Sequence, residues 1–118
     1  MNTRSVIAAM MAAAMSAAYA GHFASAAAPS QDPPGKAPYE EFCRKCHGVR
    51  GVPPKTMKAK YAKIATFDSA FVAKHSDDSV VTVLTKGKNE DMKSFKEKLS
   101  HEQMVAVAAY IRSFSAKN

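Results

Sequence analysis

The segment Cys43-Arg44-Lys45-Cys46-His47 constrains this chain more than any other feature of the sequence. Two cysteines three positions apart, followed at once by a histidine, form the attachment pattern of a c-type haem. The thiols of Cys43 and Cys46 can add to the two vinyl groups of the porphyrin, and His47 can then bind the iron from one face. The segment therefore predicts one covalently bound haem c, around which the chain must fold.

Other uses of the two cysteines remain open at this point. They could pair as a disulfide in an exported protein, or act as a redox-active dithiol. Dithiol folds alternate strands with helices, but the β-branched cluster Val80-Val81-Thr82-Val83 lies inside a helical pattern. A zinc site needs about four ligands, and the other histidines are scattered along the chain. Haem attachment accounts for all three side chains together.

The N-terminus has the pattern of a secretory signal peptide. One basic residue, Arg4, precedes the uncharged run Val6–Ala20, which is rich in alanine and methionine and ends in a small-x-small cleavage pattern. We expect a signal peptide at residues 1–20, cut after Ala20 or alternatively after Ala26. A membrane span needs about 20 strongly apolar residues, so no stable membrane insertion of the mature chain is expected. Because bacteria attach haem to cysteines outside the cytoplasmic membrane, we expect a periplasmic protein.

The mature chain is the size of one small domain. Removal of residues 1–20 leaves 98 of the 118 residues. The segment 21–37 is rich in Ala, Pro and Ser and is expected to be a flexible leader, followed by a haem domain at 38–118. Because so short a chain builds a modest core, the apolar haem, at about 25 cal/mol per Å² buried, is expected to supply much of the stability.

The patterning of the domain predicts helices and loops. A first helix is expected to start at Pro38 and to end at Gly48 and Gly51, and short helical pieces are expected within 55–67 and 68–74. Ser76 is a predicted N-cap of a helix that runs to Lys86 and stops at Gly87.

The last part of the chain is predicted to be a loop followed by a long helix. The loop covers residues 88–99. Ser100 and Gln103 form a predicted capping box. The helix that follows carries an apolar face with a helical period, made of Met104, Val107, Ala108, Ile111 and Phe114.

From Pro38 to Phe114 the chain resembles the class I c-type cytochromes, which are small soluble electron carriers with a single haem. The likeness rests on the Cys43–His47 motif with Tyr39 before it, on Met92-Lys93-Ser94-Phe95, and on Leu99–Gln103 leading into a helix with Tyr110-Ile111. It implies an all-α fold of three to five helices around the haem, with the first and last helices crossing. Lys93 stands where the commonest ligand loop of that family has proline.

Several residues are candidates for the second axial ligand, namely Met57, Met92, Met104, His75 and His101. The apolar stripe of the last helix accounts for Met104, whereas nothing in core periodicity accounts for Met92 in its polar loop. We therefore predict His47 and Met92 as the axial ligands, and a neutral thioether ligand raises the reduction potential. A histidine such as His75, or an open position, is the alternative. In the family a proline carbonyl orients the ligand histidine, which points to Pro53 or Pro54.

The charge balance of the chain bears on its partners. The formal net charge is +7, and it is +6 once Arg4 leaves with the signal peptide. Lysines gather in two groups, Lys55, Lys58, Lys60 and Lys63, and then Lys86, Lys88, Lys93, Lys96 and Lys98. The second group brackets Met92, so several of its lysines are expected near the edge of the haem. We predict a basic docking face for acidic redox partners, with a merely solvated surface as the alternative. No nucleic-acid motif is present, and a monomer is expected.

The leading functional prediction is a periplasmic electron carrier with no catalytic residues. A haem subunit of a larger membrane-associated oxidoreductase is the first alternative, because a basic face suits both. A haem enzyme or gas-binding module is the second, and it requires an open or easily displaced sixth ligand.

Overall fold

The structure, a computed structural model, describes residues 31–116, so the predicted signal peptide and most of the predicted leader lie outside the described residues. Residues 31–116 form helices and loops without strands, which confirms the all-α prediction. The elements are α1 (Lys36–Phe42), α2 (Arg44–His47), α3 (Lys55–Lys60), α4 (Ser69–Lys74), α5 (Asp77–Lys86), α6 (His101–Arg112) and the 3₁₀-helix η1 (Ser113–Ala116). Six α-helices appear instead of three to five, partly because the first helix is interrupted at Cys43.

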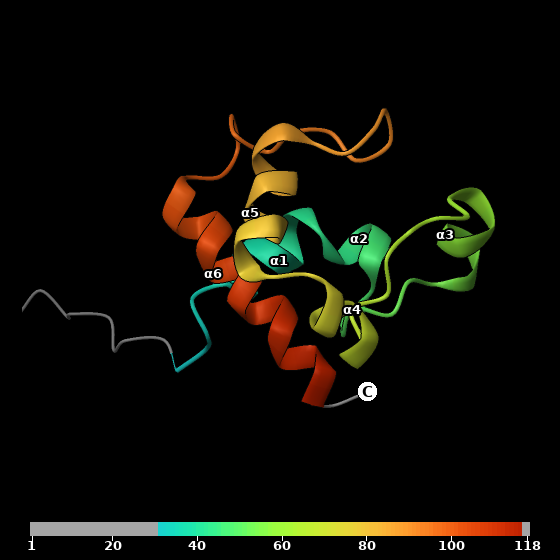
Figure 1. Cartoon of the computed structure of the whole chain (residues 1–118), viewed down its shortest axis with the longest axis horizontal. Coiled ribbons are helices and arrows are strands. Elements are labelled where there is room, and N and C mark those ends of the chain that lie inside the picture. The colour runs from blue at the N-terminus through green and yellow to red at the C-terminus, as the bar shows by residue number, and fades with distance from the viewer. Residues whose placement is uncertain (1–30, 117–118) are drawn as a thin grey trace, which may run out of the picture.

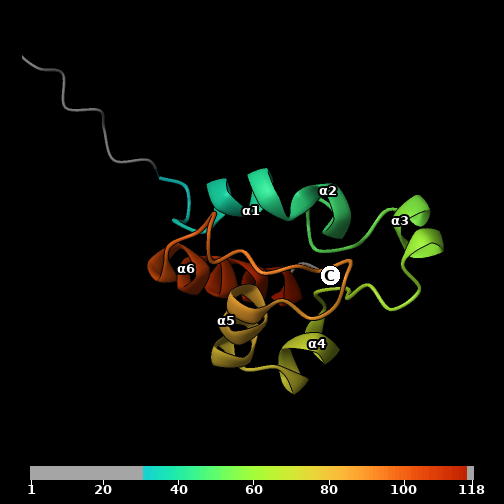
Figure 2. The same cartoon turned by 90° about the horizontal axis from the view of Figure 1, so that it is seen from above.

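The long C-terminal helix α6 is the centre of the fold. It packs against α1 on one side and α5 on the other, and α4 contacts η1 at its end (Figures 1 and 2). A Cβ at Gly35, just before α1, would lie 2.0 Å from the carbonyl oxygen of Ala106. Glycine at this position therefore lets the start of α1 approach the backbone of α6. The first and last helices pack together as the resemblance implied.

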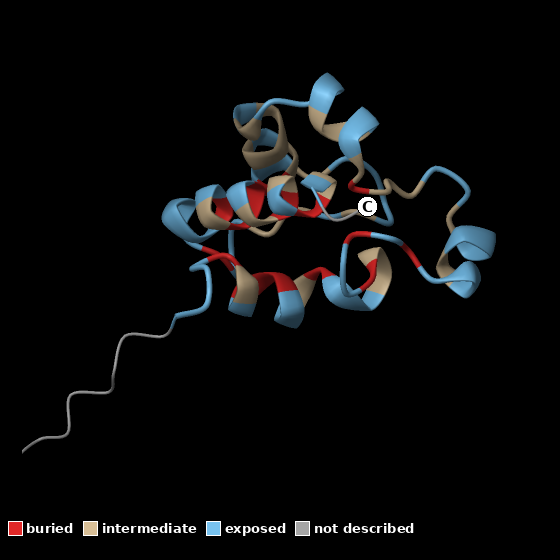
Figure 3. Cartoon of the chain, turned by 90° about the horizontal axis from the view of Figure 1, so that it is seen from below, coloured by how far each residue is buried: buried red, intermediate tan, exposed pale blue. Residues whose placement is uncertain are grey.

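The core lies between these helices. Helices α1, α5 and α6 and the 3₁₀-helix η1 all contribute buried residues, and the ribbon of these helices also carries exposed residues (Figure 3). The core comprises Tyr39, Cys43, Phe67, Leu84, Leu99, Met104, Val107, Ile111 and Phe114. The predicted apolar face of the last helix is therefore confirmed as a core face.

The helix ends follow the predicted local chemistry. Ser76 caps α5 by accepting from the Ser79 N–H, and Ser100 and Gln103 form a complete capping box at α6. Gly48 and Gly87 end α2 and α5 at φ angles of +81° and +76°, in a region that disfavours side chains with a Cβ. The first helix begins at Lys36, two residues before the predicted start at Pro38.

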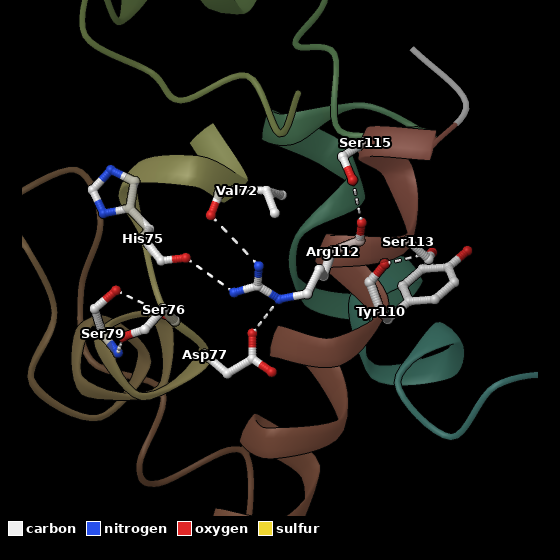
Figure 4. A network of polar contacts seen from close by, with 9 residues as sticks. All are labelled: Val72, His75, Ser76, Asp77, Ser79, Tyr110, Arg112, Ser113 and Ser115. Atoms are coloured by element: carbon white, nitrogen blue, oxygen red, sulfur yellow. Dashed lines mark hydrogen bonds and ion pairs between the residues drawn. The ribbon is translucent and has the colours of Figure 1, made fainter. Parts of the chain in front are cut away.

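Arg112 joins the end of α6 to the corner between α4 and α5 (Figure 4). Its Nε lies 2.6 Å from Asp77 Oδ1, and its Nη2 donates to the His75 carbonyl at 3.0 Å. Its Nη1 lies 3.5 Å from the Val72 carbonyl. One guanidinium thus satisfies backbone acceptors at the end of α4 and a carboxylate in the first turn of α5.

Among residues 31–116, no helix has the length and apolar character needed to cross a membrane.

Candidate functional site

The cysteine motif lies on a single helical turn that starts at Cys43. The backbone N–H groups of Cys46 and His47 both donate to the Cys43 carbonyl, at 3.2 and 2.9 Å. Residues three and four positions apart share one face of a helix, so the side chains of Cys46 and His47 both lie beside that of Cys43. No disulfide joins Cys43 and Cys46. Burial, with a smaller contribution from Cys46, raises the pKa of Cys43 to about 12, so its thiol is neutral at physiological pH.

His47 is oriented by a backbone carbonyl and an aromatic ring. Its Nδ1 lies 3.2 Å from the Ala65 carbonyl oxygen, and its ring stacks on Phe67 with a centroid distance of 4.6 Å and an interplanar angle of 18°. A carbonyl only accepts, so Nδ1 carries the proton and Nε2 keeps its lone pair. Burial lowers the pKa of His47, which favours the neutral imidazole that binds metals.

The carbonyl that orients His47 corrects the sequence prediction. Pro53 and Pro54 were the candidates, but the acceptor is Ala65. The chain leaves the motif through the two prolines, forms α3, and returns alongside the motif, where the Phe67 N–H donates to the Gly51 carbonyl at 2.8 Å. This return places Ala65 beside the imidazole. The partner is thus chosen by the path of the chain in space.

Tyr39 supports the motif from inside the core. Its side chain has no exposed surface, and its hydroxyl donates to the carbonyl of Gly48 at 2.7 Å. Gly48 directly follows His47, so this bond fixes the point where the chain leaves the motif. Tyr39 also makes edge contacts with Phe67, Tyr110 and Phe114.

Met92 lies in the loop between α5 and α6, half-buried against the core cluster. Phe95, three residues later, contacts the ring of Phe42 at a centroid distance of 6.3 Å. Phe42 directly precedes Cys43, so this contact joins the two segments predicted to hold the haem. The role of Met92 as an axial ligand stays a prediction.

The other candidate ligands have different surroundings. Met104 is only 3% exposed, and its sulfur lies 3.4 Å from the Thr85 hydroxyl, so the core accounts for it as predicted. His75 and His101 are exposed, and Met57 is half-buried in α3. The ring of His75 packs against the ring of Phe71, with a distance of 4.5 Å between the ring centroids.

The residues of the site fit a haem. Two neighbouring thiols and a neutral imidazole with a free Nε2 are the donors that covalent attachment and one axial bond require. Apolar side chains that pack on the core yet stay half-exposed come from α1, α4, α5 and the loops, and they offer a macrocycle an apolar surface. They include Phe42, Ala65, Phe71, Val80, Val81, Met92 and Phe95.

Sequence reasoning missed two features of the site. The stacking of Phe67 on His47 joins residues of two segments that no local pattern connects. Asn89 bonds to the backbone of Met92, and this contact had a local signal, because asparagine often accepts from N–H groups two and three residues ahead.

Comparison with known proteins shows the family to which the chain belongs. Residues 30–111 match the family described as cytochrome C oxidase, cbb3-type, subunit III. The structure is similar to that of the KustC0563 c-type cytochrome, with a TM-score of 0.62 and 33% sequence identity over 69% of this chain and 96% of that chain. No curated protein sequence matches the chain at a significant level. The likenesses imply covalently bound haem c and haem-based electron transfer. The chain therefore belongs to the cytochrome C oxidase, cbb3-type, subunit III family and is a small c-type cytochrome.

Proposed function

We propose that the protein is a periplasmic electron carrier that holds one haem through thioethers to Cys43 and Cys46, with His47 and Met92 as axial ligands. The observation that carries this proposal is His47, whose Nδ1 is engaged by the Ala65 carbonyl, so that Nε2 is the nitrogen free to bind iron. When bound, the haem supplies a one-electron couple, and thioether ligation raises its potential.

The surrounding residues have distinct tasks in this proposal. Ala65 and Phe67 hold the imidazole in one orientation, which strengthens it as a ligand. Cys43 and Cys46 tether the cofactor, and the half-buried apolar side chains keep water from it. With His47 and Met92 as ligands, protein side chains would fill both axial positions and leave small molecules no open site on the iron, so we propose no catalytic residue.

The basic docking face is best placed on residues 44–63, which we name the basic lobe. Residues 42–67 contain no acidic side chain. The lobe carries Arg44, Lys45, Arg50, Lys55, Lys58, Lys60 and Lys63. Helix α3 projects from one end of the molecule in two perpendicular views and is mostly exposed (Figures 1 to 3).

Two further features support the basic lobe over the second lysine group. Val49 and Val52 are 64% and 44% exposed, so the lobe combines apolar side chains with a basic surround, as protein interfaces often do. The lysines near Met92 alternate with acidic side chains, which weakens their combined field; these are Glu90, Asp91 and Glu97. We therefore propose acidic redox proteins as partners that approach the lobe.

The axial ligand is tested by the absorption spectrum of the ferric protein. Met92→Ala is expected to abolish the far-red band that reports an iron–sulfur bond, whereas Met57→Ala, a matched half-buried methionine, retains it. Survival of the band in Met92→Ala would show that another residue binds the iron. Carbon monoxide should not bind the reduced wild type at neutral pH, and binding would favour a gas-binding module.

The basic lobe is tested with matched charge reversals. Lys55→Glu/Lys58→Glu is expected to slow electron transfer to a small acidic redox protein more than Lys86→Glu/Lys88→Glu does, and salt should slow the wild type. Equal effects of the two double variants, or a rate insensitive to salt, would contradict the assignment.

A subunit of a larger oxidoreductase is the second candidate, because the family is described as an oxidase subunit. Gel filtration of a native extract separates the two functions. A haem-bearing peak at the size of the mature chain supports the carrier, and a peak only at the size of a large complex supports the subunit.

A further inference from the structure

The loop that presents Met92 lacks the proline of the commonest ligand loop in c-type cytochromes and has Lys93 in its place. A proline ring fixes one backbone dihedral, so without it the Met92 backbone must be held by other contacts. In the structure, hydrogen bonds engage both the N–H and the carbonyl of Met92.

Asn89 engages the Met92 backbone directly. Its Oδ1 accepts from the Met92 N–H at 2.8 Å and from the Asp91 N–H at 3.0 Å. The Met92 carbonyl in turn accepts from the Lys88 N–H at 2.7 Å. Both polar groups of the Met92 backbone are therefore satisfied inside the turn 88–92.

The downstream side of the loop rests on α5. The Ser94 hydroxyl donates to the Thr85 carbonyl at 2.6 Å, and the Phe95 N–H donates to the Leu84 carbonyl at 2.7 Å. Gly87 makes this closure feasible, because a Cβ there would lie 2.8 Å from the Ser94 nitrogen and 3.0 Å from the Met92 carbonyl oxygen. The upstream side depends on the Asn89 turn.

We propose that Asn89 is a positioning residue that holds Met92 in place for axial ligation, a task that proline performs in the commonest loop of the family. This inference rests on the proposed ligation by Met92. Asn89 is exposed, so its substitution removes no buried side chain. Its effect should therefore fall on the lability of the ligand and not on the stability of the fold.

The test uses the haem-loaded protein and cyanide as a probe that competes for the sixth position of ferric iron. Asn89→Ala is expected to bind cyanide about three- to tenfold faster than wild type, the factor that corresponds to losing the one net hydrogen bond to the Met92 N–H. Its far-red band should also disappear at a lower temperature. Asn89→Asp keeps an acceptor oxygen and should behave like wild type, as should Glu90→Ala, an exposed neighbour in the same loop.

Three outcomes would overturn the inference. The first is that Asn89→Ala binds cyanide at the wild-type rate. The second is that Asn89→Asp binds cyanide as fast as Asn89→Ala does. The third is that Asn89→Ala loses global stability, measured by far-UV circular dichroism, to the same extent as it loses the iron–methionine bond. Met92→Ala separates this failure from that of the proposed function. If Met92→Ala loses the far-red band while Asn89→Ala is unaffected, the ligand is right and the positioning role is wrong.

Discussion

Tyr39 shows how a single side chain can serve both the core and the site. Among residues 31–116 it is the largest fully buried side chain, and its hydroxyl donates to the carbonyl of Gly48, the residue after the Cys43–His47 motif. A buried hydroxyl without a partner would be costly, so the bond also restricts where Gly48 can lie. Its ring contacts Tyr110 and Phe114, which links the motif to the C-terminal part of the fold.

The first prediction concerns Tyr39 and pH. Burial raises the pKa of Tyr39 above its ordinary value near 10, so the folded state favours the neutral phenol. Its contribution is fully present below about pH 10 and is lost as the pH rises further, because the unfolded chain then ionises first. Tyr39→Phe should reduce the free energy of unfolding by about 1 kcal/mol at pH 8, and by less at pH near 11.

Urea unfolding of wild type and Tyr39→Phe, followed by circular dichroism at several pH values, measures this difference. If the difference in unfolding free energy between wild type and Tyr39→Phe stays constant from pH 8 to 11, the phenol of Tyr39 ionises as readily in the folded protein as in the unfolded chain.

At the scale of the element, local signals account for where most helices start and stop. The serine caps of α5 and α6 and the glycines after α2 and α5 act through neighbours in the sequence, so the predictions hold. The break between α1 and α2 at Cys43 had no such signal. Arg112 likewise acts on α4 and α5 across a large sequence separation.

The capping box of α6 gives the second prediction. Ser100→Ala removes the acceptor for the Gln103 N–H and should cost about 1 kcal/mol of unfolding free energy. Ser76→Ala, which removes the cap of α5, is the matched control and should have a similar effect. Denaturant midpoints of the haem-loaded variants provide the measurement, and an unchanged midpoint in Ser100→Ala would show that the box is dispensable.

Arg112 gives the third prediction. Arg112→Ala should destabilise the protein by about 1–2 kcal/mol, because two backbone carbonyls and a carboxylate lose a charged donor. The value is modest since the Arg112 and Asp77 side chains are 38% and 47% exposed.

Variants with one partner altered separate the contributions at Arg112. Arg112→Lys keeps the charge but not the planar fork, so it should recover less than half of the loss. Asp77→Asn, which leaves the carbonyl contacts, should cost less than Arg112→Ala. An equal loss in Asp77→Asn would assign the whole effect to the ion pair. Thermal melts of the haem-loaded variants supply the data.

At the scale of the whole molecule, the cofactor and the core belong together. Cys43 is itself part of the core cluster, and the half-buried apolar side chains that pack on this cluster would be buried further by a haem attached there. For so small a domain this surface is a large share of the stabilising area. Haem attachment and folding should therefore be coupled.

The fourth prediction tests this coupling. Cys43→Ala/Cys46→Ala cannot attach haem covalently, and after removal of any loosely bound haem it should lose much of its helical signal and its cooperative melting. Cys46→Ala keeps one thioether site and serves as the control. A haem-free double variant with a wild-type melting curve would show that the polypeptide core alone is sufficient.

The sequence by itself determined the features that depend on neighbouring residues. The spacing of Cys43, Cys46 and His47 indicates the cofactor, haem c. The helix caps, the glycines and the apolar periodicity predict an all-α fold, because these effects act within a few residues. The tertiary structure decided the partners of the motif. Ala65 orients His47, Phe67 stacks on it, and the return of the chain beyond α3 brings both to the site. Such contacts depend on how the chain closes in three dimensions, and a pattern in sequence does not record that path.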